Sequence, residues 1–138
     1  MKVKKVKGGL LRQVQAACDG EVCLGLFKGR KLVGFIAYDP ATVFEPFIFV
    51  SGVVVRKDSR KEGSRLLLTA MARVIRNTQA VIKKKAGKFF LMCETQSTAG
   101  ERLVKLAERR FGFTVVDWGW VSRTAEGGKQ SGAWEEFV

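Results

Sequence analysis

The sequence predicts a single α/β (α+β) domain in which a mixed, mostly antiparallel sheet carries helices on both faces. Segments with the alternation or the β-branched character of strands are interspersed with segments whose apolar residues recur at helical spacing. The chain has 138 residues, of which 46% are hydrophobic, and no internal repeat or linker divides it. We therefore expect one domain over residues 1–138, with the element order β-α-β-β-β-α-β-α-β and a further strand near the C-terminus.

The N-terminal half is expected to form four strands and one helix. Residues 1–7 alternate apolar and basic side chains, which is typical of an edge strand. Apolar residues at near-helical spacing predict a short helix over residues 8–20. Residues 21–40 contain two strand-like runs joined by a Lys-Gly-Arg turn and therefore predict a hairpin. A fourth strand is expected over residues 44–55, and Gly52 inside it indicates a bulge or a close approach to the backbone.

The C-terminal half is expected to alternate helices with strands. A long amphipathic helix is predicted from the apolar stripe between Leu66 and Ile82. The continuous apolar run at residues 88–94 is suited to a buried strand. A second amphipathic helix follows over residues 97–113, and another strand over residues 113–123. The tail, residues 126–138, has a Gly/Ser-rich turn and then a short segment that we expect to pair as the last strand.

Charge is the outlying feature of the composition. The chain has 25 Lys and Arg against 13 Asp and Glu, which gives a net charge of +12 and a pI of about 10.1. This balance indicates attraction to a polyanion such as a nucleic acid, although a generally basic solvated surface is the alternative. Trp118, Trp120 and Trp134 would suit stacking on single-stranded nucleic acid. Core or partner packing is the favoured explanation, because Trp118 and Trp120 lie two residues apart on one strand and therefore on one face.

Several classes of site are excluded or disfavoured by composition. Histidine is absent, which excludes His-based triads and His metal sites. Three cysteines without a CxxC motif support neither a disulfide framework nor a zinc site, so we expect no metal. No apolar run is long enough to span a bilayer and no signal-peptide pattern is present. We therefore expect a cytoplasmic protein with no membrane contact.

The most informative stretch is VVVRKDSRKEGSRLLL at residues 53–68, where a strand runs into a helix through a cationic loop at residues 56–64 and Gly63 stands where we expect the helix to start. Unpaired N–H groups and the helix dipole favour a phosphate at such a helix start. Gly63 would allow close approach of a ligand, Ser64 would cap the helix or bind a phosphate oxygen, and Arg60 and Lys61 would supply charge. A capped helix start in a solvated loop is the alternative.

This stretch resembles the signature of the GNAT N-acetyltransferase superfamily, in which a strand carrying V-x-x-x-x-R-x-x-G-x-G/A leads into a helix. Val55, Arg60 and Gly63 match the first part of that pattern, and Arg65 stands where the family has glycine or alanine. A second segment, CETQSTAGERLVKLAERRFGF at residues 93–113, is similar to the strand and helix that close in Gly-Phe in this family. With the order of elements, the resemblance covers roughly residues 1–122.

The resemblance implies that the protein binds acetyl-coenzyme A. Its loop would hold the pyrophosphate through Arg60, Lys61, Glu62, Gly63, Ser64 and Arg65. The backbone of Val53, Val54 and Val55 would pair with the pantetheine arm like an added strand.

The resemblance also implies direct attack of an amine on the thioester, which needs a base and an acid. Candidate bases are Glu45, at the start of the fourth predicted strand, and Glu94, at the end of the fifth. Each of them could equally be an exposed charge at a strand end without a catalytic role. The family often has a tyrosine as the acid four residues before the Gly-Phe. That position is Glu108 here, and the single tyrosine is Tyr38 on another strand. We expect Cys93 to be a core residue rather than a nucleophile.

Two functions from different classes follow. The first is an acetyltransferase that acts on an amine of an unknown acceptor. The second is a catalytically inactive GNAT-like protein with a structural or nucleic-acid-associated role. Arg65, the missing tyrosine and the net charge of +12 favour the second function, and the order of elements and the strand–loop–helix motif favour the first.

Overall fold

The computed structural model confirms the predicted fold class and the order of elements. It describes residues 1–42, 44, 47–86, 90–95 and 98–117. The elements are β1 (Lys2–Lys5), α1 (Gly8–Ala17), β2 (Val22–Lys28), β3 (Lys31–Asp39), β4 (Phe47–Val55), a 3-10 turn η1 (Lys57–Ser59), α2 (Arg60–Ala86), β5 (Phe90–Cys93), α3 (Thr98–Phe111) and β6 (Val115–Asp117). The predicted last strand and the three tryptophans lie outside the described residues. Within those residues, no helix combines the length and the apolar character that a bilayer span requires.

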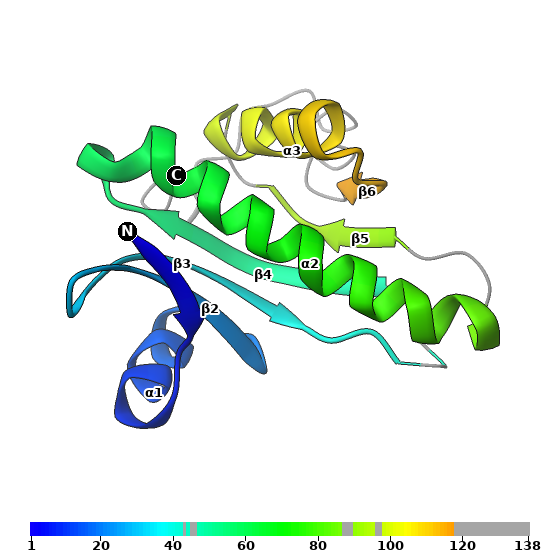
Figure 1. Cartoon of the computed structure of the whole chain (residues 1–138), viewed down its shortest axis with the longest axis horizontal. Coiled ribbons are helices and arrows are strands. Elements are labelled where there is room, and N and C mark those ends of the chain that lie inside the picture. The colour runs from blue at the N-terminus through cyan, green and yellow to red at the C-terminus, as the bar shows by residue number, and fades with distance from the viewer. Residues whose placement is uncertain (43, 45–46, 87–89, 96–97, 118–138) are drawn as a thin grey trace.

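The six described strands form one sheet in the order β1-β2-β3-β4-β5-β6. The first three pairings are antiparallel and the last two, β4 with β5 and β5 with β6, are parallel. Parallel neighbours need a crossover, and α2 and α3 provide the two crossovers (Figure 1). The mixed, mostly antiparallel sheet predicted from the sequence is therefore confirmed.

The sheet is covered on both faces. On one face α2 lies across the strands with α3 beside it, and on the other face α1 packs under the N-terminal strands (Figure 1). Leu67, Met71 and Ile75 of α2 join the larger core cluster with Leu26, Ile48 and Val55 of the sheet. Val14 of α1 belongs to a second cluster with Val6, Cys23, Phe27, Phe35 and Ala37.

A bulge in β4 allows side chains on both sides of it to point into the same core cluster. Ala37 pairs with Gly52 and Tyr38 pairs with Val50, so Ser51 is an extra residue on β4. The extra residue shifts the alternation of side chains by one position. Ile48 and Val50 before the bulge and Val53 and Val55 after it consequently all reach the larger core cluster.

Gly52 lies next to the bulge and against the end of α1. A Cβ atom at this position would lie 2.1 Å from the Sγ atom of Cys18, the residue that follows α1. A distance this short is impossible for a real side chain, so glycine is required for α1 to seat on the sheet. The predictions of a bulge and of a close approach at Gly52 are both confirmed, and the group that approaches is Cys18.

The connection between β4 and α2 differs from the expected loop over residues 56–64. The 3-10 turn η1 follows Arg56 directly, and the N–H of Ser59 donates a hydrogen bond to the Arg56 carbonyl oxygen at 2.9 Å. α2 then begins at Arg60, so Gly63 and Ser64 lie within the helix and Ser64 does not cap it. The expectation that the helix starts at Gly63 is wrong because η1 turns the chain into helical geometry earlier.

Gly63 serves helix packing. It is buried, and a Cβ atom on it would lie 2.5 Å from Cδ2 of Leu26 and 3.0 Å from Cγ1 of Val55. The first turn of α2 therefore rests directly on β2 and β4, which a larger residue would prevent.

Substitution of Gly63 by alanine tests this packing. We expect Gly63→Ala to lower the free energy of unfolding by about 1–3 kcal/mol, because the added methyl group overpacks the contact with Leu26 and Val55. Gly9→Ala is the matched control in α1, where the only atom within 4 Å of an added Cβ is Nη2 of Arg12 at 3.9 Å. We expect this control to raise stability by about 0.5–1 kcal/mol. Urea denaturation measures both, and equal effects would contradict the packing role.

Candidate functional site

The site begins where β4 loses one of its neighbours. β4 pairs with β5 over four residues, from Phe47 with Phe90 to Val50 with Cys93. β5 ends there, whereas β4 continues through the bulge to Val55. In the part of the chain that the structure describes, no strand pairs with this edge of β4 between Ser51 and Val55. This edge can take an extended ligand or peptide in place of a strand.

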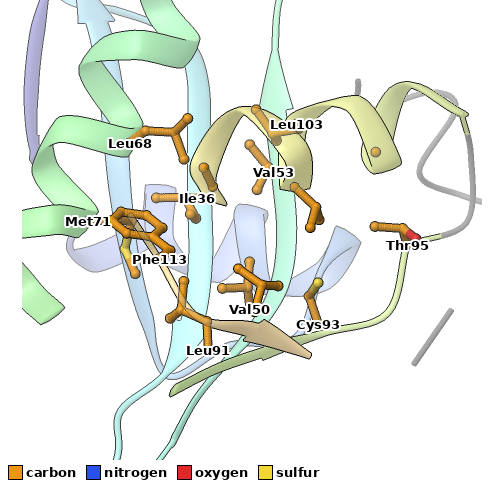
Figure 2. Close-up of a pocket in the computed structure, with 14 residues that line it drawn as sticks. Ile36, Val50, Val53, Leu68, Met71, Leu91, Cys93, Thr95, Leu103 and Phe113 are labelled. Carbon is orange, nitrogen blue, oxygen red and sulfur yellow. The ribbon is translucent and has the colours of Figure 1, made fainter. Parts of the chain in front are cut away.

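An apolar cavity lies beside that edge, between the sheet and the two helices (Figure 2). Its volume is about 50 Å³. No polar surface is exposed inside it. Its lining comes from six elements: Ile36 of β3, Val50 and Val53 of β4, Leu91 and Cys93 of β5, Val115 of β6, Leu68 and Met71 of α2, and Leu103, Val104 and Ala107 of α3. This volume corresponds to roughly one or two water molecules, which is comparable to the size of a small acyl group.

A hydrogen-bonded polar pair lies at one end of the cavity. Thr95 is 3% exposed and lies at this end in Figure 2. Its N–H donates to Oδ1 of Asp117 at 3.0 Å, and its hydroxyl donates to Oδ2 of the same carboxylate at 2.5 Å. The pair ties the end of β5 to β6, because Asp117 is also the register partner of Cys93. The two hydrogen bonds therefore hold the backbone of Thr95 in place at this end of the cavity.

Cys93 is a core thiol, as expected from the sequence. It is buried in the larger core cluster and lines the cavity. Burial raises the pKa of Cys93 to about 12, and the carboxylates of Asp117 and Glu108 add to the shift. A thiol with so high a pKa stays protonated at neutral pH, so Cys93 is unsuited to act as a nucleophile.

A cationic groove adjoins the cavity between the start of α2 and the outer face of α3. It has a volume of about 880 Å³, and Leu103 lines both the groove and the cavity. Five of the residues that line the groove are cationic: Arg60, Lys61, Arg65, Arg102 and Arg110. Among the residues that the structure describes, no carboxylate lines it, and Leu103, Leu106 and Phe111 add apolar surface. A groove with this lining suits an anion that also carries an apolar or aromatic part.

The structure brings together part of the predicted phosphate-binding set. Arg60, Lys61, Ser64 and Arg65 all line the groove, and Arg65 is exposed and lies on its wall. Glu62 and Gly63 do not line it. Glu62 is exposed in the first turn of α2, where a carboxylate complements the helix dipole.

The three predicted valines of β4 separate between the two faces of the sheet. Val53 and Val55 are buried in the larger core cluster, and Val53 lines the cavity. Val54 packs against the second cluster under α1. The backbone of all three lies along the edge that no described strand covers.

Of the predicted acid–base residues that the structure describes, none lines the cavity. Glu94 follows β5, is exposed and does not line the cavity, although its chain neighbours Cys93 and Thr95 do. Glu45 lies outside the described residues. Tyr38 is buried in the larger core cluster, which raises its pKa, with Cys23 as a smaller cause. Glu108, at the position of the family's tyrosine, is exposed on α3.

The sequence patterns do not single out three residues near the site, which are Asp117, Arg102 and Arg110. Asp117 is a carboxylate inside an apolar strand pattern, which is a signal for a buried hydrogen-bonded acid. Arg102 and Arg110 fit the polar side of the amphipathic helix predicted over residues 97–113, and they lie eight residues apart on α3, where both line the groove. Spacing that places two arginines on one helix face was the available signal.

Comparisons with protein-family models, with curated proteins and with solved structures returned no significant match. The resemblance to the GNAT superfamily therefore depends on the motifs and on the order of elements.

The raised pKa of Cys93 makes stability depend on pH in the alkaline range. The folded state holds this proton up to pH about 12, whereas the thiol of an unfolded chain has its ordinary pKa of about 9.0, so the folded state binds more protons between these values. We therefore expect the free energy of unfolding to fall as pH rises above 9. Urea denaturation between pH 8 and 10 should show a shallower fall in Cys93→Ala than in the wild type. Identical slopes would contradict the burial of this thiol.

Proposed function

We propose that this protein binds a coenzyme A thioester and transfers a small acyl group, such as acetyl, to an amine. The observation that carries the proposal is the continuity of three features: the edge of β4 between Ser51 and Val55 that no described strand pairs with, the apolar cavity beside it, and the cationic groove that shares Leu103 with the cavity. Coenzyme A has matching parts, which are an amide-bearing arm, a thioester and a phosphorylated nucleoside.

The groove fits the phosphates through side chains rather than through a glycine-rich loop. Guanidinium groups bind phosphate oxygens in pairs, and Arg60, Arg65 and Arg102 come from two helices that face each other across the groove. Gly63 packs against Leu26 and does not contribute to the groove. Arg65, which departs from the family pattern, adds a cation to the wall of the groove.

The edge of β4 would receive the pantetheine arm. Amide groups of the arm would pair with backbone groups of this strand as a neighbouring strand does. The acyl end would then lie at the cavity, whose volume of about 50 Å³ favours a short acyl group over a long chain. Specificity for acetyl would follow from the side chains of Val53, Met71 and Leu103.

The transfer needs a base for the amine. The amine nitrogen attacks the thioester carbon, the new C–N bond forms, and the C–S bond breaks. A proton passes from nitrogen to a carboxylate, for which Glu94 is the described candidate and Glu45 the second, and the departing thiolate takes a proton from solvent. Glu94 is exposed, so the proton can pass directly or through one water molecule.

Calorimetry with acetyl-coenzyme A tests the proposal. We expect binding in the micromolar range and at least a tenfold loss of affinity in Arg65→Gln/Arg102→Gln, since each charge-assisted hydrogen bond contributes about 1.5–3 kcal/mol. The matched control is Arg73→Gln/Lys105→Gln, which makes the same change of charge on the same two helices at residues that do not line the groove. The control should bind like the wild type.

Two results would contradict the proposal. The first is no binding of acetyl-coenzyme A by the wild type, and the second is an equal loss in both double variants. Either result would favour the catalytically inactive alternative. Where binding is found, loss of acetyl transfer to a panel of amines in Glu94→Gln, with affinity for the coenzyme unchanged, would support Glu94 as the base.

A further inference from the structure

One end of the sheet carries a concentration of cations outside the groove. This end of the sheet is formed by the start of β1, the turn between β2 and β3, and the end of β4. We call it the cationic rim, and it consists of Lys2, Lys28, Arg30, Lys31, Arg56 and Lys57. All six side chains are exposed.

The register places these residues together. Lys2 pairs with Phe27, the neighbour of Lys28 in β2. Lys28 pairs with Lys31 across a two-residue turn, Gly29-Arg30. Beside β3, the N–H of Arg56 donates to the carbonyl oxygen of Val33 at 2.8 Å, which holds the chain after β4 next to the start of β3.

Within the part of the chain that the structure describes, one ion pair involves a cation of the rim. Asp58 is the carboxylate nearest to them in the chain, and it forms an exposed ion pair of 3.9 Å with Nε of Arg56. Lys28 and Lys31 lie directly opposite each other, an arrangement of like charges that destabilises a strand pair. The turn therefore has three cations within four residues, and the repulsion between them lowers the stability of the fold. A bound anion would reduce this repulsion.

We propose that the cationic rim binds the phosphodiester backbone of a nucleic acid. The rim offers separate ammonium and guanidinium groups along the ends of several strands, which suits repeated phosphates better than one compact anion. The contacts that these six cations can make are to phosphates, which carry no sequence information, so the rim itself would bind without regard to base sequence. The proposal does not depend on coenzyme binding, because none of the six residues lines the groove.

Fluorescence polarisation at several salt concentrations tests this site. The probes are a labelled duplex DNA of mixed sequence, one strand of it alone, and an RNA duplex of the same sequence. The rim variant is Lys28→Gln/Arg30→Gln/Lys31→Gln. The control variant is Arg12→Gln/Lys105→Gln/Arg109→Gln, which removes the same charge from exposed positions on α1 and α3.

The rim variant should bind duplex DNA at least tenfold more weakly than the wild type. Its slope of log K against log salt should be smaller by about 2–3, because each lost phosphate contact removes about 0.9 from the slope. The control should retain the slope of the wild type to within about one contact. The thermal midpoint of the rim variant should equal or exceed that of the wild type, since its like-charge pair has been removed.

Three results would overturn the proposal. Equal weakening in the rim and control variants would show that net charge alone determines binding. An unchanged slope in the rim variant, with its thermal midpoint retained, would place the contact elsewhere. Displacement of the duplex by polyglutamate of equal charge at equal concentration would show that the rim accepts any polyanion, acidic proteins included.

Discussion

The structure depends on the bulge at Ser51, in the middle of β4. The extra residue lets Ile48 and Val50 before it, and Val53 and Val55 after it, fill the same core under α2 and α3. It also turns Gly52 toward Cys18, so that α1 can seat on the opposite face. β4 pairs with both β3 and β5 at Phe49 and Val50, and with β3 alone from Gly52 to Val55, so among the described strands its other edge has no partner beside the cavity.

The order of elements could be read from the sequence because periodicity reports which side chains are buried. Alternation and helical spacing gave the strands and helices of this sheet within a few residues. The start of α2 could not be placed in this way, since charged residues such as Lys57 and Arg60 occur equally in loops and in exposed first turns. For the same reason a glycine such as Gly63 fits both a phosphate loop and a tight helix–sheet contact, and only the position of Leu26 decides between them.

The candidate site was predictable where it is local in the chain. Arg60, Lys61 and Arg65 follow one another along the start of α2, so one motif located them together. Arg102 and Arg110 join them only through the packing of α3 beside α2, and the pair of Thr95 with Asp117 exists only because β5 and β6 are neighbours. Such contacts are properties of the tertiary structure, which a single sequence does not encode in its local pattern.

Hydrogen exchange of the β4 backbone, with and without acetyl-coenzyme A, tests most directly whether this strand edge receives the coenzyme. Amides on an edge without a partner strand exchange readily, and pairing with the pantetheine arm would slow them. We predict that saturating acetyl-coenzyme A protects those amides between Ser51 and Val55 that point away from β3, with no comparable change in β1 or α1. Binding of the coenzyme without protection of this segment would contradict the proposed role of β4.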